Sequence, residues 1–324
     1  MQGSTKDKVL FILEESRGKS ISGAGIAQKL EISRNAVWKA IKLLQAEGHQ
    51  IDAGTNKGYR LCQDNDILSV SGMLPYLAGL PPPRLYQELE STNIVAKEMS
   101  AAGAGHGTCV MAERQTAGRG RQGRSFFSPP GHGIYMSIVL EPKKLGHETP
   151  SFITIYTAVA VCEAIEALCP NKYPKIKWVN DLFLEGKKIC GISAEADLEL
   201  NTGAINRVVV GVGINFTLSK DLPKELKPIV GALYNNEKPP INRNQLAAQI
   251  LKQITNPKPP PQAEIIQNYK QRLFILGQKL QVLSNQPYEA TAQDITQEGH
   301  LIVQTTTGQK ITLSAGEISI KPKD

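Results

Sequence analysis

The sequence predicts an α+β protein made of three consecutive domains. Its 324 residues are too many for one ordinary domain. The apolar periodicity changes along the chain from helical, to mixed helix and strand, to strand only. Proline-rich stretches separate the zones. We therefore expect a winged helix-turn-helix domain at 1–64, a linker at 65–84, a mixed helix-and-strand domain at 85–274 and a small β domain at 275–324.

Composition excludes several classes of protein. Hydrophobic residues make up 41% of the chain, which is enough for a folded core. No apolar run approaches the roughly 18 residues of a membrane span, and the start MQGSTKDKVL has no signal core. Five cysteines form no CxxC pair and five histidines form no HExxH motif, so we expect reduced thiols and no protein-borne metal centre. The sequence predicts a cytoplasmic protein that makes no membrane contact.

The first zone has the order of a DNA-binding winged helix. Ser33 is a good N-cap for a helix over 34–47, and 51–61 alternates like a hairpin wing. The alternative is a three-helix domain with a solvated basic face. The net charge of residues 1–66 is only +2, so the element order carries the prediction. The residues expected to face DNA are Ser22, Arg34, Asn35, Lys39 and Lys42.

The middle zone predicts one main sheet with packed helices. Gly133–Leu140 and Arg207–Asn215 are apolar enough for buried strands, and Phe152–Leu168 is apolar on all sides, as in a core helix. Glu185 and Gly186 form a two-residue turn between two further strands. Helices and strands alternate without a regular period, which favours α+β over a doubly wound fold.

An arginine–glycine loop in this zone predicts an anion-binding site. Gly118–Gly123 matches GxGxxG, but the chain continues into Ser-Phe-Phe-Ser-Pro-Pro, which cannot open a dinucleotide-binding helix. Arg119, Arg121 and Arg124 alternate with glycines and can hold phosphate or carboxylate oxygens. The alternative is a solvated basic loop, but three neighbouring arginines repel one another unless an anion lies among them.

Five motifs in register resemble those of the biotin protein ligases, most closely the bifunctional ligases that also repress the biotin operon. The likeness extends over essentially the whole chain, and the motifs are Ser91–Asn93, Glu113–Arg124, Lys177–Asp181, Lys188–Ile192 and Gly211–Asn215. The resemblance implies a central domain of the biotin/lipoate ligase type and a C-terminal SH3-like β barrel. That barrel would dock ATP and the carrier protein, or it would only cap the domain before it.

The resemblance also assigns roles to residues. Lys188, Arg119 and Arg121 would be catalytic, with Lys188 between the biotin carboxylate and the α-phosphate, while Lys187 would be an exposed lysine. Gly120 and the two arginines would cover biotin and its adenylate. The remaining biotin-binding residues would be Ser91, Thr92, Asn93 and Gln115. The ATP-binding residues would be Arg124, Phe126, Asn180, Asp181 and Asn215, with Asn180 and Asp181 on the Mg²⁺ side.

Three positions depart from the family pattern. Val179 stands where proline is common, which makes the turn before Asn180 less rigid. Phe126 stands where tryptophan is frequent and would stack on adenine with less area. Gln122 replaces an arginine and removes one positive charge, which would change how tightly the adenylate is held.

The implied activity has two steps, with biotin and ATP as substrates and Mg²⁺ as cofactor. Biotin and ATP give biotinyl-5'-AMP, and biotin passes to a lysine of the biotin carboxyl carrier protein of a biotin-dependent carboxylase. The adenylate-bound homodimer would bind the biotin operator. Two alternatives remain at this stage: a lipoate-type ligase, and a biotin-sensing repressor without ligase activity.

Overall fold

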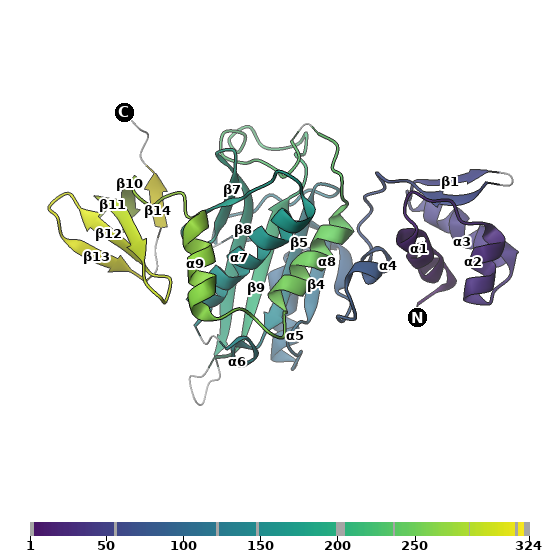
Figure 1. Cartoon of the computed structure of the whole chain (residues 1–324), viewed down its shortest axis with the longest axis horizontal. Helices are drawn as coiled ribbons and strands as arrows, with labels where there is room; N and C mark the ends of the chain where they lie inside the picture. The colour runs from purple at the N-terminus through teal and green to yellow at the C-terminus, as the bar shows by residue number, and fades with distance from the viewer. Residues whose placement is uncertain are drawn as a thin grey trace. The chain divides into compact units, whose positions relative to one another are not determined.

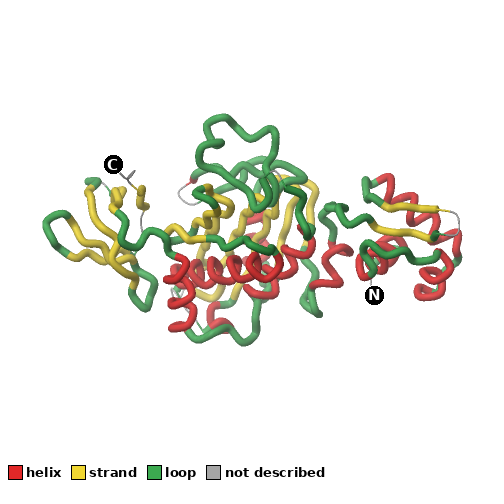
Figure 2. The backbone as a smooth tube through the Cα atoms, turned by 45° about the horizontal axis from the view of Figure 1, so that its top comes forward, coloured by secondary structure: helices red, strands yellow, loops and turns green. Residues whose placement is uncertain are grey.

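The computed structural model describes residues 3–54, 57–120, 123–146, 149–198, 205–235, 237–284, 286–314 and 317–320. The chain divides into two compact units, which are described separately. One unit comprises Met1–Leu85 with Asn236–Lys252, and the other comprises Tyr86–Asn235 with Gln253–Asp324. Figures 1 and 2 trace the elements of each unit.

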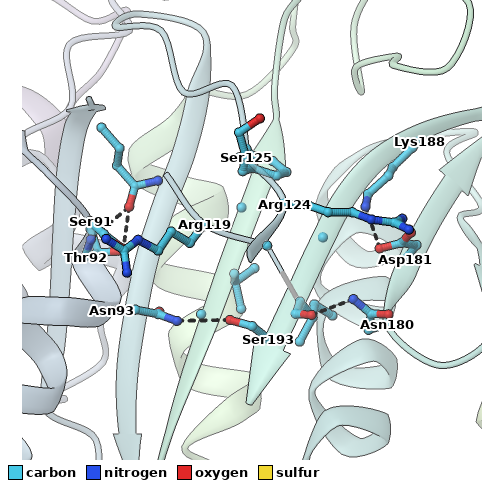
Figure 3. A pocket seen from close by; sticks show the side chains of 18 of the residues that line it. Ser91, Thr92, Asn93, Arg119, Arg124, Ser125, Asn180, Asp181, Lys188 and Ser193 are labelled. Atoms are coloured by element: carbon cyan, nitrogen blue, oxygen red, sulfur yellow. Dashed lines mark hydrogen bonds and ion pairs between the residues drawn. The ribbon is translucent and has the colours of Figure 1, made fainter. Parts of the chain in front are cut away.

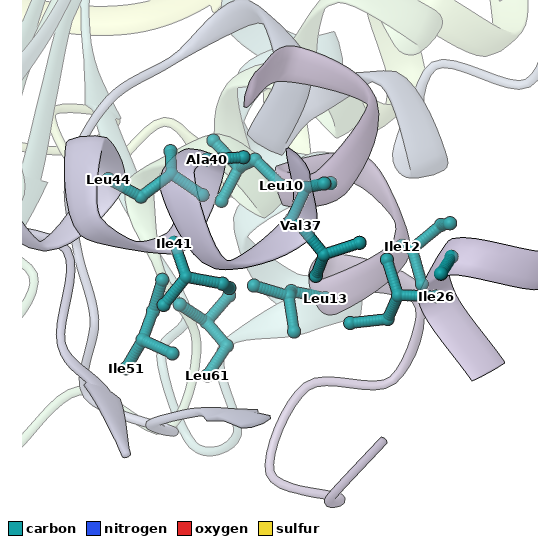
Figure 4. Close-up of a cluster of buried hydrophobic side chains, with 12 residues drawn as sticks. Leu10, Ile12, Leu13, Ile26, Val37, Ala40, Ile41, Leu44, Ile51 and Leu61 are labelled. Atoms are coloured by element: carbon teal, nitrogen blue, oxygen red, sulfur yellow. The ribbon is translucent and has the colours of Figure 1, made fainter. Parts of the chain in front are cut away.

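The first unit begins with the predicted winged helix. Its helices are α1 (Thr5–Glu15), α2 (Gly23–Leu30) and α3 (Arg34–Ala46), and the wing pairs β1 (Ile51–Gly54) with β2 (Gly58–Leu61). The Ser33 side chain accepts a hydrogen bond from the Ala36 amide at 3.1 Å, which caps α3 as predicted. Apolar side chains from all three helices and both strands meet in one buried cluster (Figure 4). The helix-turn-helix and its wing are therefore confirmed.

The stretch predicted as a linker is partly helical. It contains α4 (Val70–Met73) and the 3-10 turn η1 (Leu74–Tyr76), and both pack against α1. Leu68, Met73 and Leu77 are buried there. The turn-rich and proline-rich ends of this stretch hid these apolar residues in the sequence.

The start of α8 (Arg243–Ile254) anchors the same stretch. Arg243 is 2% exposed and its Nε lies 3.0 Å from Asp66 Oδ2. Asn244 accepts from the Ser69 amide at 2.9 Å and donates to the Ile67 carbonyl at 2.8 Å. A buried arginine that is both paired and hydrogen-bonded fixes this stretch of backbone.

The second unit is built on one main sheet, as predicted. The seven strands lie in the order β3-β4-β5-β9-β8-β7-β6, and the neighbouring pairs from β4 to β6 are antiparallel. The strands are β3 (Arg84–Leu89), β4 (Cys109–Gln115), β5 (Gly133–Leu140), β6 (Lys175–Lys177), β7 (Asp181–Leu184), β8 (Lys187–Leu198) and β9 (Ile205–Asn215). The β7–β8 turn falls at Glu185 and Gly186, both with positive φ, as predicted.

Helices cover the sheet. Helix α7 (Pro150–Leu168) packs on β7, β8 and β9, with α9 (Gln262–Arg272) beside it (Figure 1). Helix α5 (Thr92–Ala101) packs on β4, β5 and β9, and α6 (Pro142–Leu145) is a single turn. Helix α7 is long and apolar enough to cross a membrane, but 72% of its apolar window is buried inside the protein, as in a core helix. Helix α9 ends at Arg272, because Leu273 is extended and the residues after it form turns.

The C-terminal zone contains strands only. Five strands form an antiparallel sheet in the order β13-β12-β11-β10-β14. They are β10 (Lys279–Leu283), β11 (Tyr288–Ile295), β12 (Leu301–Thr305), β13 (Lys310–Leu313) and β14 (Glu317–Ile320). Trp178 connects this sheet to the rest of the second unit, because its indole N–H donates to the Gly299 carbonyl at 3.0 Å.

Candidate functional site

A cavity of about 310 Å³ opens on the second unit and collects most of the predicted site residues (Figure 3). The start of α5, the end of β4, the arginine–glycine loop and strands β7 to β9 all contribute side chains. The predicted residues that line it are Ser91, Thr92, Asn93, Gln115, Arg119, Gly120, Arg124, Phe126, Asn180, Asp181 and Lys188. Arg121 and Gln122 lie outside the described residues. Asn215 is not among the lining residues; its amide donates to the Gly231 carbonyl at 3.0 Å.

One end of the cavity is held by hydrogen bonds between uncharged side chains. The amide and the hydroxyl of Thr92 both donate to Gln115 Oε1, at 2.8 and 3.1 Å. The Gln115 amide in turn donates to Ser128 Oγ at 3.0 Å. Ser91 and Thr92 are each 3% exposed, so this end of the cavity is formed by buried groups with fixed orientations.

Ser137 and Asn93 extend the same network. The Ser137 hydroxyl lies 2.7 Å from Thr92 Oγ1 and 2.5 Å from Asn93 Oδ1. The Asn93 amide donates to Ser193 Oγ at 3.1 Å and to Glu195 Oε1 at 2.8 Å. Ser137 was not among the predicted site residues, although it is the one serine in the mostly apolar strand β5 and that contrast could have marked it.

The charge of Glu195 is stabilised beside this network. Burial raises the pKa of its carboxyl, but hydrogen bonds from Lys97 and Asn93 outweigh burial and lower the pKa below its ordinary value. Lys97 Nζ lies 2.9 Å from Glu195 Oε2. Asn93 therefore faces a charged acceptor, which orients its amide nitrogen toward Glu195.

Two glycines of β9 let the site close tightly. A Cβ at Gly211 would lie 2.4 Å from Asn93 Oδ1, and a Cβ at Gly213 would lie 2.7 Å from the Phe126 ring. The Phe126 ring also makes an edge contact with Tyr135, with centroids 6.3 Å apart. The spacing of the two glycines thus reflects the close approach of α5 and the loop to the sheet.

The other end of the cavity is ionic. Lys188 Nζ lies 2.6 Å from Asp181 Oδ1, and these side chains are 27% and 24% exposed. Figure 3 shows Arg124 extending toward the same pair. Asn180 donates to the Ile192 carbonyl at 2.8 Å. Lys187 is used elsewhere, since its Nζ donates to the carbonyls of Lys227 and Pro228.

The arginine–glycine loop forms a narrow hairpin at the cavity mouth. The Gly120 amide donates to the Arg124 carbonyl at 2.7 Å, and the Phe126 amide donates to the Gly118 carbonyl at 2.8 Å. Arg119 Nη2 lies 3.0 Å from Glu90 Oε1, with both side chains more than half exposed. Residues 124–132, which come directly after the loop, contain no helix. This agrees with the rejection of a dinucleotide-binding motif.

The predicted DNA-facing residues lie exposed in the first unit. Arg34, Asn35, Lys39 and Lys42 are exposed along α3. Ser22 is exposed and caps α2, accepting from the Gly25 amide at 2.9 Å.

Profiles of three protein families match consecutive parts of the chain. The biotin/lipoate A/B protein ligase family matches residues 85–215. A helix-turn-helix domain matches 5–60, and the biotin protein ligase C-terminal domain matches 275–321. These three matches follow the order of the zones predicted from the sequence.

Individual relatives identify the family. The bifunctional ligase/repressor BirA of Bacillus spizizenii is 36% identical over 257 residues, which cover 78% of this chain and 77% of that protein. The chain belongs to the biotin protein ligase family. BirA of Escherichia coli is 29% identical over 74% of this chain and 72% of its own length. The biotin protein ligase from Aquifex aeolicus, solved in complex with biotin and ATP, superposes with a TM-score of 0.61 at 25% identity, covering 74% of this chain and 99% of that one.

Proposed function

We propose that this ligase joins biotin to ATP in the described cavity and passes the biotinyl group to a lysine of a biotin carboxyl carrier protein. One observation carries the proposal. The cavity has an uncharged hydrogen-bonding end and an ionic end, which suits a small acid with a polar ring at one end and a carboxylate at the other.

The uncharged end would bind the ureido ring. That ring offers N–H donors and a carbonyl acceptor, and Ser91, Thr92, Asn93 and Gln115 offer both kinds of partner. Their mutual hydrogen bonds hold them in place before the ligand arrives, which lowers the cost of ordering them on binding.

The ionic end would carry the first step. A biotin carboxylate oxygen attacks the α-phosphorus, the bond to the β-phosphate breaks, and pyrophosphate leaves with the bonding electrons. Both reactants are anions, so Lys188, Arg119, Arg121 and Arg124 would offset their repulsion and stabilise the charge that develops on the phosphoryl oxygens. Phe126 would pack against the adenine. Asn215 is two residues beyond Gly213, which lines the cavity, and would act on the nucleotide only indirectly.

Asp181 with Asn180 fits a magnesium site. Mg²⁺ favours hard oxygen ligands, usually one or two carboxylates together with substrate phosphates. The described residues form no group of three His, Cys, Asp or Glu side chains, so phosphate oxygens would complete the coordination. When bound, Mg²⁺ would neutralise part of the triphosphate charge.

The second step needs no protein nucleophile. The carrier lysine amine attacks the acyl carbon of the mixed anhydride, the bond to the phosphate oxygen breaks, and AMP leaves. Until then the loop over 118–124 would shield the anhydride from water. Leu283 and Ile318 of the C-terminal sheet line the same cavity, which supports a role for that domain near the nucleotide.

The winged helix gives the chain a second function as a repressor. We propose that the adenylate-bound chain forms a homodimer in the cytoplasm and that its two α3 helices bind the biotin operator about one DNA turn apart. Binding of the adenylate would favour the dimer, and the dimer would favour operator binding.

Pyrophosphate release tests the ligase function. The protein is incubated with ATP, Mg²⁺ and either biotin or lipoate. Release with biotin alone is the expected result. Release with lipoate alone would show that lipoate, and not biotin, is the substrate. No release with either acid would leave only the function of a biotin-sensing repressor. In a gel-shift assay, the affinity of the protein for operator DNA should increase when biotin and ATP are added.

A further inference from the structure

Helix α3 carries a large exposed aromatic side chain that the assigned DNA-facing residues do not include. Trp38 is 50% exposed, whereas Trp178, the other tryptophan of the chain, is 4% exposed. It lies one helical turn after Arg34 and one turn before Lys42, so it shares their side of the helix. An exposed tryptophan amid cations, on the helix proposed to bind DNA, is available to contact apolar surface on a partner.

We infer that Trp38 determines sequence specificity by contacting the C5-methyl group of a thymine in the major groove. This inference rests on the proposed repressor function. It adds an apolar base contact to a surface that otherwise consists of side chains suited to phosphates and polar base edges.

The position of Trp38 along the helix supports a base contact. In helix-turn-helix proteins the N-terminal part of the recognition helix reaches the base edges. Trp38 is the fifth residue of α3, whose bounds are Arg34–Ala46, and it lies within this part. Leu43, the other large exposed apolar residue of α3, belongs to the C-terminal half and is about 140° away around the helix.

The chemistry of the groove selects thymine. Base faces are stacked inside a duplex, so an indole in the major groove meets only base edges. The thymine methyl is the one methyl group among the major-groove edges, and most other edge positions offer polar donors or acceptors. Arg34, Lys39 and Lys42 would hold the phosphates and fix the register in which Trp38 meets that methyl.

Trp38 lies outside the hydrophobic core of the winged helix. It is half exposed, while Val37 and Ile41 on the same helix are buried in that core. Replacing Trp38 should therefore change the surface of α3 without removing a core side chain.

Thymine-to-deoxyuridine replacement tests the inference, because the two bases differ only by the methyl group. Duplexes are first selected by the wild-type protein, with biotin and ATP, from a random-sequence pool. Each thymine of the selected duplex is then replaced in turn, and affinity is measured for the wild type, Trp38→Ala, Trp38→Phe and Leu43→Ala. Loss of one buried methyl contact predicts about a fourfold weaker wild-type complex at one position in each half-site.

The expected pattern is a coupling between that position and Trp38. The deoxyuridine effect should vanish in Trp38→Ala, persist in part in Trp38→Phe and persist fully in Leu43→Ala. An equal loss of affinity for the wild type and Trp38→Ala on deoxyuridine replacement would overturn the inference. So would the absence of any position at which this replacement weakens binding of the wild type. Failure of the wild type to enrich any sequence would instead contradict the repressor function. Protection of Trp38 from acrylamide quenching with biotin and ATP but without DNA would show that a second copy of the chain covers it, which would also overturn the inference.

Discussion

The two ends of the cavity are built from different interactions. At one end, Thr92 and Gln115 are joined by hydrogen bonds, and Ser137 beneath them has no exposed surface. At the other end, Lys188 is paired with Asp181, and both side chains are about a quarter exposed. The first end has a fixed shape, whereas the second is held by a contact that water and salt weaken.

This difference matches the demands of the proposed reaction. A buried hydrogen-bond network is costly to disturb, because each buried group left without a partner destabilises the protein by about 1–3 kcal/mol. In the loop at the cavity mouth, the pair of Arg119 with Glu90 is more than half exposed. Such an exposed ion pair contributes only about 0–1 kcal/mol, so an incoming phosphate can separate it easily. Under the proposed function, the protein would combine a preformed site for the ring of biotin with cations that can exchange their carboxylate partners for the phosphates.

Removal of Lys188 should have the largest effect. Lys188→Ala takes away the cation nearest the proposed reaction centre, and loss of one such group lowers a rate by about 10²–10³-fold. Lys187→Ala is the matched control, since its Nζ is bonded to the Lys227 and Pro228 carbonyls. Pyrophosphate release measures both. Near-normal turnover of Lys188→Ala would remove this residue from the mechanism.

Removal of the Ser137 hydroxyl should weaken the uncharged end. In Ser137→Ala, Asn93 and Thr92 lose a shared partner, and we expect the KM for biotin to rise about tenfold with little change in kcat. Thr157→Ala is the control, because this hydroxyl is equally buried and bonds only to the Ile153 carbonyl, at 2.7 Å. A rise in KM in both variants would point to general loss of packing.

Separation of Arg119 from Glu90 should have a smaller and opposite effect. Glu90→Gln removes the competing carboxylate, so the adenylate should be retained up to about fivefold longer. Glu88→Gln is the control two residues earlier on the same segment, where Glu88 pairs with Arg114 at 2.9 Å and similar exposure. Dissociation of labelled adenylate gives the rates, and faster loss from Glu90→Gln would contradict the account.

Acid should produce the smallest effect, through Glu195. Hydrogen bonds from Lys97 and Asn93 lower the pKa of Glu195 below 4.5 in the folded protein, against the opposing effect of burial. Its contribution to stability is therefore complete above pH 4.5 and is lost as pH falls through the folded-state pKa. Thermal midpoints of the wild type and Glu195→Gln, measured from about pH 6 to about pH 3, should converge in acid. Parallel curves would argue against this linkage.

Much of this arrangement was predictable from the sequence. Local patterns define β5, the turn at Glu185 and Gly186, and the cap of α3, because each depends on neighbouring residues. The arginine–glycine loop and Lys188 could be assigned because motifs in the family order accompany them.

The pairings across the cavity were not predictable. Asn93 meets Glu195, and Arg119 meets Glu90, through contacts between residues far apart in the chain. Helix α4 was not predicted, because turn-forming residues flank this short stretch on both sides. Its burial depends on contacts with α1 and α8. Trp38 was passed over because apolar residues in a helix are usually assigned to the core.

Salt dependence of binding tests the contrast between the two ends most directly. Calorimetry would compare biotin methyl ester, which has no charge, with ATP, over about 0.05 to 0.5 M salt. The affinity for the ester should stay nearly constant while the affinity for ATP falls steeply. An equal loss for both ligands would contradict the assignment of the ring to the hydrogen-bonded end and of the phosphates to the ionic end.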